Sequence, residues 1–170
     1  SHAFIVAALL LSTSAYAQEI TPVAASAATP IKQPWLYEGS DVPVDTTWTF
    51  GSLPNGLRYA VKKNDVPAGQ VSIRVRIDAG ALHENDDEQG FAHLIEHLSF
   101  RGSTFVPDGE AKRIWQRFGV TFGSDSNAQT TPTQTVYKLD LPNVTPEKLD
   151  ESIKIISGMI RNPRISDVAL

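Results

Sequence analysis

A strictly alternating segment places the strongest constraint on how this chain can fold. From Val71 to Ile77 the sequence reads VSIRVRI, in which every second residue is apolar and the residues between them are polar or basic. Successive side chains of a β-strand point to opposite faces, so a period of two predicts a strand with one face against a core. Residues Thr135–Leu141, TVYKLDL, alternate in the same way. The sequence therefore predicts strands whose apolar faces are covered by other elements.

The remaining segments predict a hairpin and further strands. The Pro54-Asn55-Gly56 turn lies between residues 48–50 and 57–61 and predicts a hairpin, because Asn-Gly readily supplies the positive φ angles of a tight turn. A short strand is expected at 120–122, followed by turn residues at 123–128.

Helices are expected in three places, each marked by apolar residues at helical spacing or by end signals. They are residues 89–100, residues 109–118 followed by Gly119, and a helix that starts at Pro146 with Thr145 as its N-cap and ends near 162. The apolar face expected for the last helix consists of Leu149, Ile153, Ile156 and Ile160. The order of strands and helices predicts an α+β fold with a mainly antiparallel sheet packed against helices.

The N-terminal segment has the pattern of an export signal. An apolar run from Ala3 to Leu11 is too short to span a bilayer, which takes about 20 apolar residues, and Ala15-Tyr16-Ala17 fits a small-x-small cleavage site. We predict a signal peptide at 1–17, a linker or extended segment at 18–47 and the start of a domain at 48–170, in a periplasmic or secreted protein without stable membrane insertion. The alternative is that the apolar run is a buried terminal strand or helix.

Composition limits the chemistry. The chain has 15 Lys and Arg against 19 Asp and Glu, a net charge of −4, which argues against nucleic acid as a partner because phosphate backbones require a concentrated positive surface. It contains no cysteine. Disulfides, thiolate ligands and cysteine nucleophiles are thereby excluded within this sequence, and a transition metal would have to be held by histidine and carboxylate ligands.

The segment His93-Leu94-Ile95-Glu96-His97 contains the residues suited to such chemistry. On a helix, positions 93 and 97 differ by about 40° and positions 93 and 96 by about 60° in the opposite sense, so the three polar side chains share one face. Two imidazoles one turn apart can converge on a single Zn²⁺. The apolar residues Leu94 and Ile95, with Phe91, Leu98 and Phe100, are expected to pack this helix into a core.

Zinc that is held by three protein ligands and keeps one open position can activate water, and Glu96 is then suited to be the general base. The reaction class is metal-assisted amide hydrolysis. His83 and Glu84 are candidates for the third ligand by residue type alone, since nothing in the sequence fixes them on the metal-facing side. The alternative is an amphipathic helix whose histidines and glutamate lie on a solvated face.

Two stretches around this motif resemble a known family. They are residues 78–84, DAGALHE, and residues 90–104, GFAHLIEHLSFRGST, with Asn127-Ala128-Gln129-Thr130 further along the chain. Together they resemble the reversed H-x-x-E-H signature of the pitrilysin-like inverzincin zinc metallopeptidases, the family of insulin-degrading enzyme and mitochondrial processing peptidase.

By this resemblance, His93 and His97 are zinc ligands and Glu96 is the catalytic base. The family completes the site with a glutamate far downstream, which here would fall beyond Leu170. The resemblance therefore implies the N-terminal part of a longer protein, with little or no activity from residues 1–170 alone.

The resemblance also implies how substrate is bound. Family members add the peptide as a strand at the sheet edge that carries the Asn-Ala pair, which makes Asn127 and Ala128 substrate-binding residues. The alternative for Asn127 is ordinary turn chemistry. The expected function is a zinc endopeptidase for peptides or unfolded polypeptides. The alternative is a non-catalytic binding or assembly subunit of a heteromeric peptidase, and a homo- or heterodimer formed through further domains stays open.

Overall fold

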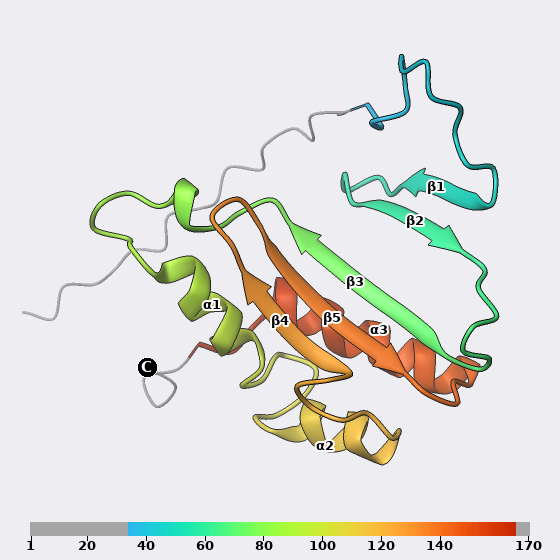
Figure 1. Ribbon diagram of the computed structural model, residues 1–170. Coiled ribbons are helices and arrows are strands. Elements are labelled where there is room, and N and C mark those ends of the chain that lie inside the picture. The colour runs from blue at the N-terminus through green and yellow to red at the C-terminus, as the bar shows by residue number, and fades with distance from the viewer. Residues whose placement is uncertain (1–33, 166–170) are drawn as a thin grey trace, which may run out of the picture. The chain divides into compact units, whose positions relative to one another are not determined.

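The computed structural model describes residues 34–165 (Figure 1), so the predicted signal peptide at 1–17 lies outside the described residues. The chain divides between Val61 and Lys62 into two compact units, which we describe separately. Within residues 34–165, the helices are all too short or too polar to cross a membrane.

The first unit contains the predicted hairpin. Its strands are β1, Trp48–Ser52, and β2, Arg58–Lys62. Gly56 has a φ of 86°, and the side-chain oxygen of Asn55 accepts a hydrogen bond from the Leu57 amide at 3.2 Å. The hairpin forms as predicted, but within the Asn-Gly pair only Gly56 takes a positive φ. The ring of Phe50 lies 5.0 Å from those of both Trp35 and Tyr37, measured between centroids.

The second unit is built on a sheet in the order β3-β5-β4, with both strand pairs antiparallel. The strands are β3, Val71–Ile77, β4, Ser126–Thr130, and β5, Thr135–Leu141. Burial alternates along β5, where Leu139 and Leu141 are each 1% exposed. The two alternating segments are therefore paired strands, and the predicted α+β fold with an antiparallel sheet is confirmed.

A short turn of residues 131–134 connects β4 to β5. The Thr131 amide donates to the Gln134 carbonyl at 2.8 Å. The backbone that follows β3 also forms hydrogen bonds to this turn. The Ala81 and Leu82 amides donate to the carbonyls of Thr131 and Pro132. The turn pairs Thr130 with Thr135 and so fixes the register of β4 on β5.

The helices of this unit are α1, Phe91–Ser99, α2, Glu110–Arg117, and α3, Pro146–Arg161, with a single 3₁₀ turn at Ala81–His83. Figure 1 shows α3 running along one face of the sheet. The core lies between that face, α2 and α3, and its most deeply buried side chains are Trp115, Leu139, Leu141, Ile155 and Met159. The Thr145 hydroxyl accepts a hydrogen bond from the Lys148 amide, which confirms the predicted N-cap.

Two details of the prediction are wrong. Residues 120–122 form no strand, and the strand begins instead at Ser126, inside the expected turn. The apolar character of Val120 reflects core packing in the connection after α2, where it is 3% exposed and its amide donates to the Trp115 carbonyl at 2.9 Å.

The predicted buried face of α3 is wrong at one position: Ile156 is buried and Leu149 and Ile160 are partly buried against the core, but Ile153 is exposed. Ile153 is 51% exposed, whereas Ser152, Ile155 and Met159 are buried. Gly158 is also buried on this face, and a side chain there would collide with Ser103 and Phe105 of the loop before α2. The absence of a side chain at Gly158 lets this loop approach the helix closely. A count of large apolar residues does not reveal such a position.

Candidate metal and catalytic site

The helix α1 is fixed at its N-terminus by a residue that lies upstream of it. Gly90 precedes the helix with a φ of 93°, and the Glu84 carboxylate accepts hydrogen bonds from the Gly90 and Ala92 amides, each at 2.7 Å. These two backbone donors hold the pKa of Glu84 below its ordinary value. Glu84 thus satisfies two of the amides that the first turn of a helix leaves without partners.

We expect this cap to make the stability of the protein depend on pH. A carboxyl whose pKa is depressed in the folded state stabilises that state above its unfolded pKa, near 4.5, and the stabilisation disappears as the pH falls through the folded pKa. Glu84→Gln should therefore lower the melting temperature at pH 7 and change it much less near pH 3. Thermal denaturation of both proteins at the two pH values measures this, and an equal loss at both would contradict a charged cap.

The two candidates for a third ligand both have other partners. Glu84 caps α1, and the Nδ1 of His83 accepts a hydrogen bond from the Gly80 amide at 3.2 Å. Within residues 34–165 there is no group of three or more histidine, aspartate or glutamate side chains placed to hold a metal ion. The described part of the chain therefore offers a pair of candidate ligands, not a complete set.

That pair consists of His93 and His97, which lie one turn apart on α1. Their Nε2 atoms are 3.0 Å apart and their ring centroids 4.6 Å apart, with both side chains exposed. Two nitrogens bound to one tetrahedral Zn²⁺ at about 2.0–2.1 Å would be separated by about 3.3 Å. The converging Nε2 atoms therefore fit a shared metal ion, as the spacing of the motif predicts.

Glu96 points in a different direction from the exposed residues of its helix. It is 7% exposed, and its Oε2 accepts a hydrogen bond from the Thr130 hydroxyl of β4 at 2.6 Å. The expected packing of α1 is wrong in part: Leu98 is buried, but Phe91, Leu94 and Ile95 are 52%, 39% and 49% exposed. In the described part of the chain the helix packs through Glu96, Leu98 and Ser99.

A buried tyrosine lies near the same carboxylate. The Tyr137 hydroxyl is 3.1 Å from the hydroxyl of Ser99, whose own proton is donated to the Ile95 carbonyl at 2.8 Å, so Tyr137 is the donor of the pair. Burial, together with the negative charge of Glu96, raises the pKa of Tyr137, although the bond to Ser99 partly opposes the rise. Tyr137 is therefore neutral at physiological pH.

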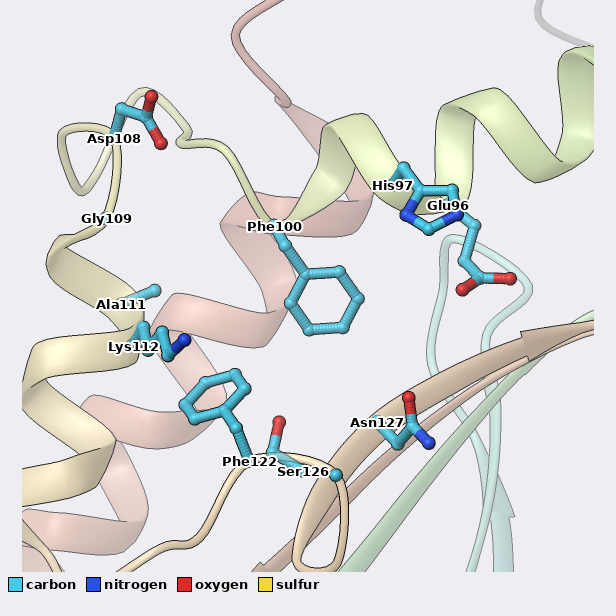
Figure 2. A pocket seen from close by; sticks show the side chains of 11 residues that line it. Glu96, His97, Phe100, Asp108, Gly109, Ala111, Lys112, Phe122, Ser126 and Asn127 are labelled. Carbon is cyan, nitrogen blue, oxygen red and sulfur yellow. The ribbon is translucent and has the colours of Figure 1, made fainter.

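A pocket of about 370 Å³ opens beside Glu96 and His97 (Figure 2). The rings of Phe100 and Phe122 lie on one side of it, and the Glu96 carboxylate points toward the strand that carries Asn127. A space of this size, with apolar walls and a few polar groups, is suited to hold a substrate side chain.

The two predicted substrate-binding residues lie on β4. Asn127 is exposed and lines the pocket, and its side-chain oxygen accepts a hydrogen bond from the Ala128 amide at 2.9 Å. β5 pairs with one edge of β4, and among the described strands none pairs with the other edge. Asn127 thus lies close to Glu96 and His97, and strand addition at this edge stays a prediction.

The motifs in the sequence do not indicate that Thr130, Ser99 and Tyr137 lie beside the site. The alternation of side chains along a strand is the signal that could have indicated Thr130. Ser126, Ala128 and Thr130 share one parity in β4 and pair with buried residues of β5, so they lie on the core face of the sheet.

Comparison with known proteins gives consistent results. The family model described as insulinase (peptidase family M16) matches residues 59–170. Probable zinc protease PqqL of Haemophilus influenzae is 38% identical over 127 residues, which are 75% of this chain and 14% of that protein. The chloroplastic stromal processing peptidase of Pisum sativum is 35% identical over 66% of this chain and 8% of its own length. The chain thus spans about one seventh or less of these relatives.

Solved structures of proteases also match this chain. The crystal structure of the periplasmic protease PqqL from Escherichia coli matches with a TM-score of 0.72 and 32% identity, over 75% of this chain and 14% of that one. Pitrilysin matches with a TM-score of 0.61 and 22% identity, over 71% of this chain and 12% of that one, and supports the fold alone.

Proposed function

Because the chain belongs to the insulinase family of peptidases, peptidase family M16, we propose that it contributes two zinc ligands and the general base to a zinc-dependent endopeptidase. The substrates are peptides or unfolded polypeptides. The observation that carries this proposal is the arrangement on one helical turn of α1. The Nε2 atoms of His93 and His97 converge to 3.0 Å, and Glu96 between them lies beside a pocket.

Each side chain has a defined role in this proposal. His93 and His97 hold the metal, and a residue outside the described part of the chain supplies the third ligand. Bound zinc would lower the pKa of a water molecule and polarise the peptide carbonyl. Glu96 takes the proton of that water and delivers it to the leaving amine. Its burial beside the pocket keeps this proton transfer away from bulk solvent.

The outer edge of β4 orients the substrate. An extended peptide added at this edge would form main-chain hydrogen bonds that demand little of its sequence, which suits unfolded polypeptides. Asn127 and Ala128 are the contacts that we propose there. A substrate side chain adjacent to the cleaved bond would enter the pocket that Phe100 and Phe122 line.

The cellular location that we propose is the periplasm or the exterior of the cell. The apolar N-terminal run with its Ala-Tyr-Ala site supports export. The relative from Escherichia coli is itself described as a periplasmic protease.

Metal removal tests the proposed function. The complete protein should hydrolyse an unfolded, fluorescently labelled casein, lose this activity after dialysis against a chelator, and regain it when zinc is restored. His93→Ala and His97→Ala should co-purify with little zinc by elemental analysis, because each leaves the metal one ligand short. Full activity in metal-free protein would contradict the proposal. Zinc binding without hydrolysis would instead favour a non-catalytic subunit.

A further inference from the structure

The carboxylate of Glu96 is held by a short hydrogen bond from the neighbouring strand. Its Oε2 lies 2.6 Å from the Thr130 hydroxyl oxygen, within the range of about 2.5–2.7 Å that is typical of a hydroxyl donating to an ionised carboxylate. Glu96 is buried and Thr130 half-buried. The contact therefore joins α1 to β4 where little water competes for either group.

Neighbouring contacts fix the direction in which the Thr130 proton points. Thr130 and Thr135 face each other across the β4–β5 pair, with their hydroxyl oxygens 3.4 Å apart. The Thr135 hydroxyl donates its single proton to the Ala79 carbonyl at 3.0 Å. The Thr130 hydroxyl also has one proton, and the much shorter distance assigns it to Glu96. The two threonines thus tie the backbone after β3, the β4–β5 pair and α1 into one chain of contacts.

We propose that Thr130 is the positioning residue of the general base. This inference rests on the proposed function and extends it to the two oxygens of Glu96. The terminal torsion of a glutamate side chain is broad, so a carboxylate without a fixed partner turns easily. The Thr130 hydroxyl donates a hydrogen bond to Oε2 and thereby holds the carboxylate in one orientation. Oε1 is then the oxygen that faces the water and accepts its proton, while Oε2 stays engaged throughout the reaction.

The position of Thr130 in β4 explains why this residue, and not its neighbour, contacts Glu96. Register places Thr130 opposite Thr135, on the same face of the sheet as Tyr137 and Leu139. Gln129, its neighbour, is exposed and lies on the opposite face. The same strand would orient substrate at its outer edge through Asn127 and Ala128, so the base and the peptide are placed by one rigid element.

The test compares Thr130→Val with Thr130→Ser in the complete zinc-loaded protein. Valine keeps the shape and removes the donor, and we expect kcat to fall about 10- to 100-fold with KM changed less than about twofold, as for loss of a hydrogen bond to a charged group. Serine restores the donor and should restore most of kcat. Zinc content and melting temperature should stay close to those of wild type. Thr133→Val, the same change at an exposed position of the β4–β5 turn, is the matched control.

The outcomes separate this proposal from the one on which it rests. An active wild type with an equally active Thr130→Val variant would overturn the role of Thr130 and leave the peptidase assignment intact. A loss of kcat that serine fails to rescue, or that follows a loss of zinc or of melting temperature, would also overturn it. A wild type with bound zinc and no hydrolysis would overturn both proposals.

Discussion

Glu96→Gln in the complete protein should lower kcat for peptide hydrolysis by about 10²- to 10⁴-fold, the range that general acid–base catalysis contributes. Glutamine has nearly the same shape, and its side-chain oxygen can still accept the hydrogen bond that Thr130 donates to Oε2. Its amide cannot take a proton from water at neutral pH. The substitution therefore removes proton transfer and leaves the packing between α1 and β4 in place.

This prediction is tested by steady-state kinetics together with elemental analysis. The variant should retain its zinc, because His93 and His97 are unchanged, and KM should change little. Glu151→Gln removes a carboxylate from an exposed position of α3 and is the matched control. Undiminished hydrolysis by a zinc-loaded Glu96→Gln protein would exclude Glu96 as the base.

Trp115→Ala should give the largest loss of stability among single substitutions in the described core. Trp115 is 1% exposed in α2 and lies in one cluster with Val120, Leu139 and Ile155. Truncation of a buried tryptophan typically lowers the free energy of unfolding by about 3–5 kcal/mol, because it loses apolar burial and leaves a cavity. Trp115→Phe should cost less. It keeps a ring in place and removes an indole N–H that has no hydrogen-bond partner among the described residues.

Amide hydrogen exchange in the complete protein measures this loss where it occurs. Protection of the α2 and β5 amides reports the free energy of opening this unit under native conditions. Ile153→Ala on α3 is the control for loss of apolar volume, because Ile153 is 51% exposed. It should change the free energy of opening by less than about 1 kcal/mol. Equal effects of the two alanine variants would mean that the Trp115 side chain contributes no more than a surface residue.

Short-range patterns predicted much of this structure. β3 and β5 follow from strict alternation, and the start of α3 follows from a threonine cap before a proline. The histidine pair follows from the same kind of pattern, because the spacing of i and i+4 fixes two side chains on one helix face without help from the rest of the chain.

What the sequence did not predict depends on contacts between distant segments. β4 reads SNAQT, which lacks the apolar alternation of a strand, and its pairing with β5 is what makes it one. The contact between Thr130 and Glu96 joins residues 34 positions apart. On α3, Ser152 and Gly158 are buried, and Gly158 lets a loop approach the helix closely, which no count of large apolar residues reveals.

The turn at residues 131–134 limits how much the length of this segment can vary among related sequences. Surface turns ordinarily tolerate insertions and deletions. Here the turn sets the register of β4, and a shift by one residue would move every β4 side chain to the opposite face of the sheet. Gln129 would then meet the general base in place of Thr130. We therefore expect natural variation at this turn to exchange residues and to conserve their number.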